Sequence, residues 1–176
     1  MTQATQNPFI QYLQSLADNQ ERGALAALRR GLGQPAWSVP EMYPHIVPRL
    51  PANQTVAQEA AYYLVASLFA LHPKSIAQGN LGGHLAQAKQ GENEDAIERR
   101  FTALLAAHPD DLPGYLRQAV SFLKSKEIPV NWEQLLYDLQ AWERPDLRAR
   151  VQKEWARAFW GRLAEQPEAP STGAPA

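Results

Sequence analysis

The stretch AAYYLVASLFAL, residues 60–71, decides the fold of this chain. Drawn as a helix, it is apolar on nearly every side, so it has no face suited to water and must lie at the centre of a core. We expect this helix to begin near Thr55 and to end at His72-Pro73, because proline cannot continue a helix. The stretch is only 12 residues long and includes Ser67, whereas a membrane-spanning helix needs roughly 20 apolar residues.

The rest of the chain repeats its apolar residues with the helical period, and no segment shows the sustained alternation that is typical of a strand. Asn7-Pro8 is typical of a helix start, because asparagine caps a first turn and proline fits within it. We therefore predict an all-α fold, an irregular bundle of about seven helices. The first starts at residue 8, and the others cover residues 20–30, 55–71, 93–107, 111–126, 131–142 and 146–163.

The length of 176 residues predicts a single α-helical domain over residues 1–163, in which two packed lobes, 8–91 and 92–163, can be distinguished. Residues 164–176 are rich in proline and small residues, and this composition predicts a disordered tail.

Two segments between the predicted helices have unusual compositions. Residues 34–53 contain five prolines, and we expect them to form an ordered connection that the prolines stiffen. Residues 75–91 contain four glycines, and we expect them to form the most mobile loop of the chain. These glycines do not make a phosphate-binding P-loop, because no Lys-Ser/Thr pair follows them and no strand precedes them.

Composition excludes several classes of function. The chain has no cysteine, so disulfides, a thiolate nucleophile and a zinc site with sulfur ligands are excluded. The N-terminus lacks the basic start and apolar run of a signal peptide, and we expect a cytoplasmic protein that does not associate with membranes. The net charge of -1 argues against a free-standing protein that binds nucleic acid tightly, because counterion release requires clustered positive charge.

Residues with the chemistry of catalysis or metal binding are scattered. The four histidines are isolated and lack the spacing of metal ligands. The acidic clusters at residues 92–95 and 110–111 precede helix starts, where carboxylates commonly cap. We therefore expect no enzyme activity, no cofactor, no metal and no small-molecule substrate, and a small hydrolase or nuclease is the weakest alternative.

Residues 131–160, NWEQLLYDLQAWERPDLRARVQKEWARAFW, contain four of the five tryptophans together with five basic residues. Large aromatic side chains at helical spacing form a rigid scaffold, and arginines between them can grip phosphate or carboxylate groups. We interpret this stretch as a binding surface and not as an active site. The tryptophans themselves are more typical of helix interiors than of platforms on which bases stack.

Basic residues gather on one side of two predicted helices. In the helix over residues 20–30, three arginines share an arc beside the apolar stripe. In the helix over residues 111–126, Arg117 and Lys124 lie together opposite the apolar residues. The last two helices add further arginines, but acids among them can neutralise several by helical pairing. The candidate nucleic-acid-binding residues are Arg22, Arg29, Arg30, Arg117, Lys124, Lys126, Arg144 and Arg148.

Three stretches together resemble a known family. They are RGALAALRRGLG at residues 22–33, ERRFTALLAAHPDDLPGYLRQAV at residues 98–120, and IPVNWEQLLYDLQAWERPDLRARVQKEWARAFW at residues 128–160. They are similar to the CasB family, the small subunit of the type I-E CRISPR Cascade surveillance complex. The similarity extends over nearly the whole chain but includes neither the glycine-rich segment nor the tail.

The resemblance implies an all-helical, non-enzymatic subunit that is present in two copies in an antiviral ribonucleoprotein. Such subunits pack against the backbone and large subunits, help to hold guide RNA and target, and cradle the displaced non-target DNA strand. Family members use a basic surface for this role, and the resemblance implies that Arg22, Arg29, Arg30 and Arg117 belong to it. The other four candidates are predicted from the helix faces alone. A sequence-blind cationic surface suits this task, because base pairing with the guide already supplies specificity.

A second hypothesis belongs to a different class of function. The chain could be a helical adaptor that binds only proteins, with its arginines directed at acidic patches on partner subunits. Binding to single-stranded DNA or RNA at low salt distinguishes the two hypotheses, since only a nucleic-acid-binding subunit shows it.

Overall fold

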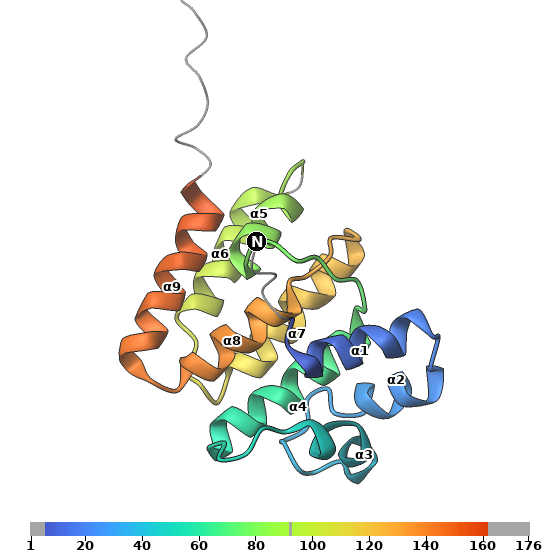
Figure 1. Cartoon of the computed structure of the whole chain (residues 1–176). Coiled ribbons are helices and arrows are strands. Elements are labelled where there is room, and N and C mark those ends of the chain that lie inside the picture. The colour runs from blue at the N-terminus through green and yellow to red at the C-terminus, as the bar shows by residue number, and fades with distance from the viewer. Residues whose placement is uncertain (1–5, 92, 162–176) are drawn as a thin grey trace, which may run out of the picture.

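The computed structural model describes residues 6–91 and 93–161, and in these ranges the chain forms nine α-helices and two short 3-10 helices (Figure 1). The α-helices are α1 (Pro8–Asp18), α2 (Arg22–Arg29), α3 (Tyr43–Ile46), α4 (Val56–Leu71), α5 (Leu81–Ala88), α6 (Glu94–Leu105), α7 (Leu112–Ser125), α8 (Trp132–Trp142) and α9 (Pro145–Trp160). The predicted all-α class is confirmed. The prediction of about seven helices omitted α3, which is a single turn, and α5.

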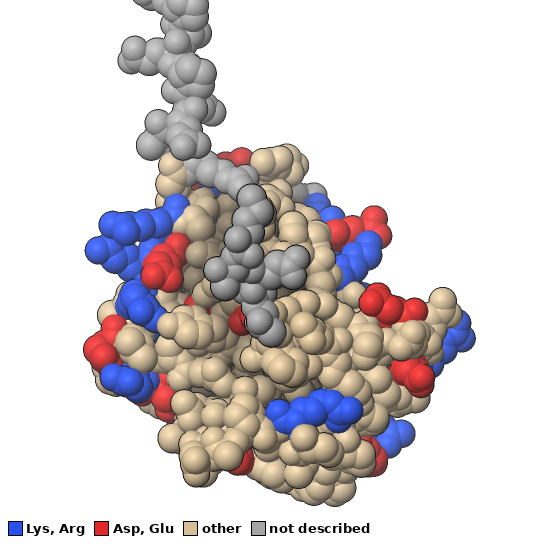
Figure 2. Space-filling view, viewed as in Figure 1, with Lys and Arg blue, Asp and Glu red and all other residues tan. Residues whose placement is uncertain are grey.

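The helices form two groups on either side of a central pair. In Figure 1, α1 to α4 lie on one side and α5, α6 and α9 on the other, with α7 and α8 between them. Accordingly, α4 packs against α2, α7 and α8, while α9 packs against α5 and α8. On the face shown in Figure 2, basic and acidic side chains are interspersed without a broad patch of one sign. The lobe boundary at residue 91 stays a prediction. In the described ranges, no helix has both the length and the apolarity that crossing a bilayer requires.

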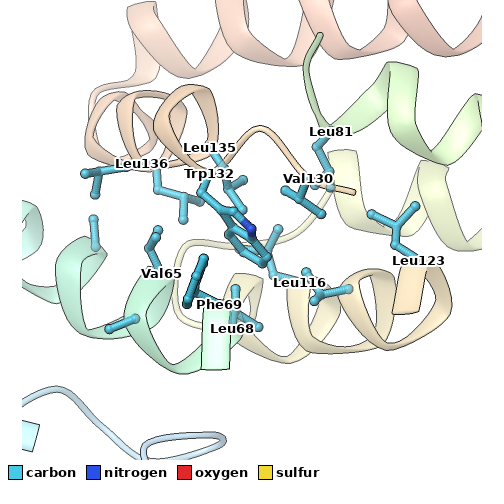
Figure 3. Close-up of a cluster of buried hydrophobic side chains, with 14 of the residues drawn as sticks. Val65, Leu68, Phe69, Leu81, Leu116, Leu123, Val130, Trp132, Leu135 and Leu136 are labelled. Atoms are coloured by element: carbon cyan, nitrogen blue, oxygen red, sulfur yellow. The ribbon is translucent and has the colours of Figure 1, made fainter. Parts of the chain in front are cut away.

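Helix α4 lies at the centre of the core, as its sequence predicts. It starts at a capping box, in which Thr55 Oγ1 accepts a hydrogen bond from Gln58 N (3.2 Å) and Gln58 Oε1 accepts one from Thr55 N (2.9 Å). Nine of its residues are buried. Figure 3 shows its side chains Val65, Leu68 and Phe69 packed among residues of α7 and α8.

Three of the four tryptophans of residues 131–160 belong to this core. Trp132, Trp142 and Trp155 are each at most 1% exposed. The Trp132 ring meets Phe69 of α4 edge to face with centroids 5.7 Å apart, and the rings of Trp142 and Trp155 lie 5.2 Å apart. The prediction that these tryptophans lie in helix interiors is confirmed. Because three of these rings are buried, they can serve as the scaffold of this stretch, and its interpretation as a binding surface stays a prediction.

The prediction of a mobile loop over residues 75–91 is wrong, because half of this segment is helix α5. Asn80 caps the helix by accepting a hydrogen bond from Gly83 N at 3.0 Å. Helix α5 packs against α7 and α9. Gly82 lies so close to α9 that a Cβ built on it would be 2.8 Å from Cα of Trp155. The glycines therefore allow two helices to approach each other, and they do not loosen the chain.

The residues before α5 are fixed as well, through a seam between residues 72–79 and 128–132. Val130 donates from its backbone N to the carbonyl oxygen of Lys74 (3.0 Å), and its own carbonyl oxygen accepts from Ile76 N (3.1 Å). Trp132 Nε1 also donates to the carbonyl oxygen of Lys74 (3.1 Å), and Asn131 Nδ2 donates to that of Gly79 (3.0 Å). These bonds join parts of the chain that lie more than 50 residues apart.

The proline-rich segment is ordered, as predicted. It contains the 3-10 helices η1 (Pro40–Met42) and η2 (Val47–Arg49), with α3 between them. Each begins with proline in its first turn, where the missing N–H costs no hydrogen bond. Residues 164–176, for which a disordered tail was predicted, lie outside the described residues.

Candidate nucleic-acid interface

The basic ridge predicted on residues 111–126 is present on α7. Arg117 and Lys124 are exposed and lie two helical turns apart on the same side. The neighbouring side of the helix buries Leu116, Val120 and Leu123 completely. Burial of the apolar stripe fixes the rotation of α7, and this rotation directs the ridge to solvent.

A groove of about 780 Å³ lies between α6 and α7. Two exposed arginines of α6, Arg99 and Arg100, line it together with Arg117 from α7. None of the described residues that line the groove is an aspartate or a glutamate. The groove therefore carries three guanidinium groups, and among its described residues no carboxylate neutralises them from within.

Small side chains keep the groove open. On α6, Ala96 and Ala103 occupy the flank next to the buried stripe, and on α7 Ala119 does the same. The floor is apolar and includes two half-buried aromatic residues of α7, Tyr115 and Phe122. The groove thus combines a hydrophobic floor with cationic walls.

Sequence reasoning missed Arg99 and Arg100. The signal available was the run Glu98-Arg99-Arg100-Phe101, in which two arginines directly precede a buried aromatic residue. Four acids among residues 92–98 obscured it, because they make the start of α6 acidic on average. Only the packing of α6 against α7 reveals that the arginines line the groove, whereas Glu94, Asp95 and Glu98 do not.

Lys126, at the C-cap of α7, extends the basic surface towards the end of the groove. Its Nζ lies 6.0 Å from the centroid of the Phe122 ring, and Phe122 lines the groove. The structure therefore brings Arg117 and Lys124 together on α7 and places Lys126 at the C-terminal end of that helix.

Arg117 also connects this helix with the turn that follows α2. A Cβ built on Gly33 would lie 3.1 Å from Nη1 of Arg117. Gly33 has a φ of +74°, a conformation that favours glycine. Arg117 therefore lies between the α6–α7 groove and a second hollow of about 520 Å³, which the turn, α4, α7 and α8 line.

Two of the three predicted arginines on α2 already have partners. Arg29 Nε donates to the carbonyl oxygen of Ala70 at the end of α4 (3.1 Å), where a cation also meets the negative end of the helix dipole. Arg30 forms an ion pair with Glu41 at 2.9 Å. Arg22 is exposed in the first turn of α2. The α2 arc is therefore less available to an anion than the α7 ridge.

The predicted residues Arg144 and Arg148 lie elsewhere, where α8 leads into α9. Arg144 pairs with Asp146 at 3.3 Å, and nearby Arg150 pairs with Glu154 at 4.0 Å. The expected neutralisation by neighbouring acids is thus confirmed for these pairs. In Figure 1 this part of the chain lies on the opposite side from α2, and in Figure 2 both signs of charge alternate over α9.

Asp138 on α8 and His84 on α5 are buried titratable groups. Asp138 accepts hydrogen bonds from Trp155 Nε1 (2.7 Å) and Gln134 Nε2 (2.8 Å), and burial raises its pKa to about 6 although both bonds oppose the rise. His84 Nε2 accepts from Asn131 N (3.1 Å), and burial lowers its pKa to about 4. Both groups hold helices together and neither lines the groove. Within the described ranges, no group of three or more His, Asp or Glu side chains could hold a metal ion.

Comparison with known proteins identifies relatives of this chain by sequence and by fold. The family model of CRISPR-associated protein Cse2 matches residues 24–160. A CRISPR-associated protein Cse2 from Thermus thermophilus is 34% identical over 164 residues, which cover 91% of this chain and 92% of that protein. The crystal structure of CasB from Thermus thermophilus matches with a TM-score of 0.76 and 32% identity, over 87% of this chain and 96% of that chain. A chain of a CRISPR RNA-guided surveillance complex matches with a TM-score of 0.71 and 28% identity, over 89% of this chain and 99% of that one.

The fold and the groove define an all-α protein with a basic cleft between two helices, an arrangement suited to binding. The family match covers well over half of the chain. The chain belongs to the Cse2 family of CRISPR-associated proteins, and the predicted resemblance to CasB is confirmed.

Proposed function

We propose that this protein is a non-catalytic small subunit of a CRISPR RNA-guided Cascade complex and holds unpaired nucleic acid on the basic surface of α6 and α7. In this role it contacts guide RNA and the displaced DNA strand and stabilises the R-loop during antiviral defence. Its protein partners are the backbone and large subunits and a second copy of itself. The matching chain from a CRISPR RNA-guided surveillance complex supports a role inside such an assembly.

The observation that carries this proposal is the α6–α7 groove. Three arginines line it, no carboxylate lies among its described lining residues, and Lys124 continues the ridge along α7. Planar guanidinium groups match the geometry of phosphate oxygens, and contacts with the backbone do not depend on base sequence. Such a surface suits a displaced strand, whose sequence the guide RNA has already selected.

The net charge of the chain limits the affinity that this surface can provide alone. Four phosphate contacts on a single strand give a decrease in log affinity of about 3 per decade of salt concentration. Binding by the isolated protein is therefore weak at physiological salt, and it becomes effective when the other subunits hold the same strand, because linked sites raise the effective concentration.

The test compares two triple variants that lose the same charge. The groove variant replaces Arg99, Arg100 and Arg117 by glutamine. The α9 variant replaces three exposed residues of α9 by glutamine, namely Arg150, Lys153 and Arg157. Fluorescence anisotropy measures the affinity for a labelled oligothymidylate over a series of salt concentrations. We expect the groove variant to lose about 2 from the slope of log affinity against log salt, and the α9 variant to keep the slope of the wild type.

The alternative function is that of an adaptor that binds only proteins. It is favoured if the wild-type chain shows no binding to single-stranded DNA or RNA at low salt, while co-expression with neighbouring subunits still yields a complex of fixed stoichiometry. Equal effects of the two triple variants would likewise count against the groove as the nucleic-acid interface.

A further inference from the structure

The floor of the α6–α7 groove has a property that binding of phosphates does not require. Tyr115 and Phe122 are half-buried aromatic residues that line the groove from the same side of α7. They lie seven residues apart, so their positions are separated by about 10 Å along the helix axis. Stacked nucleotides rise by about 3.4 Å each, and this length therefore corresponds to about three bases.

The residues around these two rings leave room for flat groups. Ala119 lies between them on α7, and Ala96 and Ala103 face them from α6. The volume of about 780 Å³ lies within the range of roughly 300–1,000 Å³ that is usual for ligand sites. Gln118 and Ser121, both exposed, add hydrogen-bonding groups beside the aromatic residues.

The charges around the groove select among possible occupants. Arg99, Arg100 and Arg117 line it, so an occupant with regularly spaced negative charge is favoured. An apolar floor next to these cations suits a molecule whose anionic backbone carries flat, weakly polar side groups. Single-stranded nucleic acid has this design, and stacking on aromatic side chains is its usual mode of sequence-tolerant binding.

We propose that the unpaired strand turns its bases into the α6–α7 groove, where they stack on Tyr115 and Phe122 while Arg99, Arg100 and Arg117 hold the adjacent phosphates. This inference rests on the proposed function and adds to it, because it states which side of the strand faces the protein. The site is then selective for unpaired strands, since the bases of a duplex are engaged with each other and cannot enter.

Two oligomers of equal length test the proposal with the wild-type full chain. One is oligothymidylate, and the other has the same sugar-phosphate backbone but no bases. We expect the abasic oligomer to bind about ten-fold more weakly or worse, because stacking contributes about 1–3 kcal/mol per base. Equal affinity for the two oligomers overturns the proposal and leaves phosphate binding by the arginines intact.

Three substitutions locate the effect. Tyr115→Leu and Phe122→Leu keep an apolar side chain against the core and remove the ring, and Tyr115→Phe keeps the ring as a control. We expect each leucine variant to weaken binding of oligothymidylate about ten-fold without changing its salt dependence, and Tyr115→Phe to bind like the wild type. If Tyr115→Leu and Phe122→Leu bind oligothymidylate normally but no longer co-purify with the other subunits, the groove is a protein-binding site and the proposal is overturned. If the wild type binds neither oligomer at low salt, the proposed function fails as well, so the two failures are distinguishable.

Discussion

Gly82 on α5 lies directly against the backbone of Trp155 on α9. A Cβ built on Gly82 would be 2.8 Å from Cα of Trp155 and closer still to the carbonyl oxygen of that residue. A backbone cannot move aside in the way that the end of a flexible side chain can. This contact fixes the distance between the two helices.

Replacement of Gly82 by alanine is therefore expected to destabilise the protein by about 2 kcal/mol or more, because overpacking outweighs the gain in helix propensity. Urea unfolding followed by circular dichroism measures the change. The neighbouring Gly83→Ala is the matched control, since a Cβ there would meet only Ala158 Cβ at 3.7 Å and the Asn80 side chain at 3.8 Å, both ordinary contacts. We expect Gly83→Ala to be neutral or to stabilise by up to about 1 kcal/mol. Equal losses in the two variants would show that the approach of α5 to α9 is not what requires glycine.

The buried groups Asp138 and His84 predict opposite dependences of stability on pH. Burial raises the pKa of Asp138 from 3.8 to about 6. The stability that this group contributes is therefore complete below about pH 3.8 and is lost as the pH rises through about 6. Burial lowers the pKa of His84 from 6.5 to about 4. The stability that this group contributes is therefore complete above about pH 6.5 and is lost as the pH falls through about 4. Each effect amounts to about 3 kcal/mol, and between about pH 4 and 6 the two largely cancel.

Two single variants separate these contributions. In Asp138→Asn only the His84 effect remains, and the free energy of unfolding should fall by about 2 kcal/mol more than in the wild type between pH 6 and pH 4, a window that covers most of the titration. In His84→Gln only the Asp138 effect remains, and the free energy of unfolding should rise over the same change. Urea titrations at several pH values measure both. Parallel pH profiles of the wild type and both variants would contradict the assignment.

The ion pair between Arg30 and Glu41 predicts a gain of function. Both side chains are more than half exposed, so their loss of contact costs little stability. Glu41→Gln removes the carboxylate and frees Arg30 for phosphate, and we expect affinity for oligothymidylate to rise by roughly two- to five-fold at low salt. Glu154→Gln, which removes the carboxylate paired with Arg150 on α9 and makes the same change in charge, is the control. An equal rise in both variants would indicate a general effect of net charge and not a contact by Arg30.

The hydrogen bond from Arg29 to the carbonyl oxygen of Ala70 predicts a structural role for that arginine. Arg29→Met keeps the aliphatic part of the side chain and removes the donor at the end of α4, and we expect a loss of about 1–2 kcal/mol in the free energy of unfolding. Arg22→Met, at an exposed position of the same helix, should leave stability unchanged. A weaker binding of DNA by the Arg29 variant must be compared with this loss before it is assigned to a lost phosphate contact.

The sequence could predict the all-α class and the position of α4 because a helix that is apolar on every side has only one place in a protein of this size. It could not predict α5, since glycines that loosen a chain and glycines that let two helices touch look the same until the partner helix is known. Gly82 belongs to the second kind, and its partner Trp155 belongs to the last helix of the described chain.

The candidate interface follows the same logic. The ridge of Arg117 and Lys124 could be read from α7 alone, because the buried stripe of that helix fixes which side is exposed. The groove could not be predicted in this way, because Arg99 and Arg100 belong to α6 and lie beside α7 only after the two helices pack together. The partners of Arg29 and Arg30 were likewise hidden, because Ala70 and Glu41 belong to other segments of the chain.

The seam between residues 72–79 and 128–132 bears on how this protein is made. The ribosome synthesises residues 72–79 first, and their backbone N–H and C=O groups remain without these partners until Val130, Asn131 and Trp132 leave the exit tunnel. A nascent or truncated chain that stops before residue 128 therefore exposes this segment to proteases, whereas the full chain protects it. The connection to α5 thus closes late in biosynthesis, after most of the polypeptide is available.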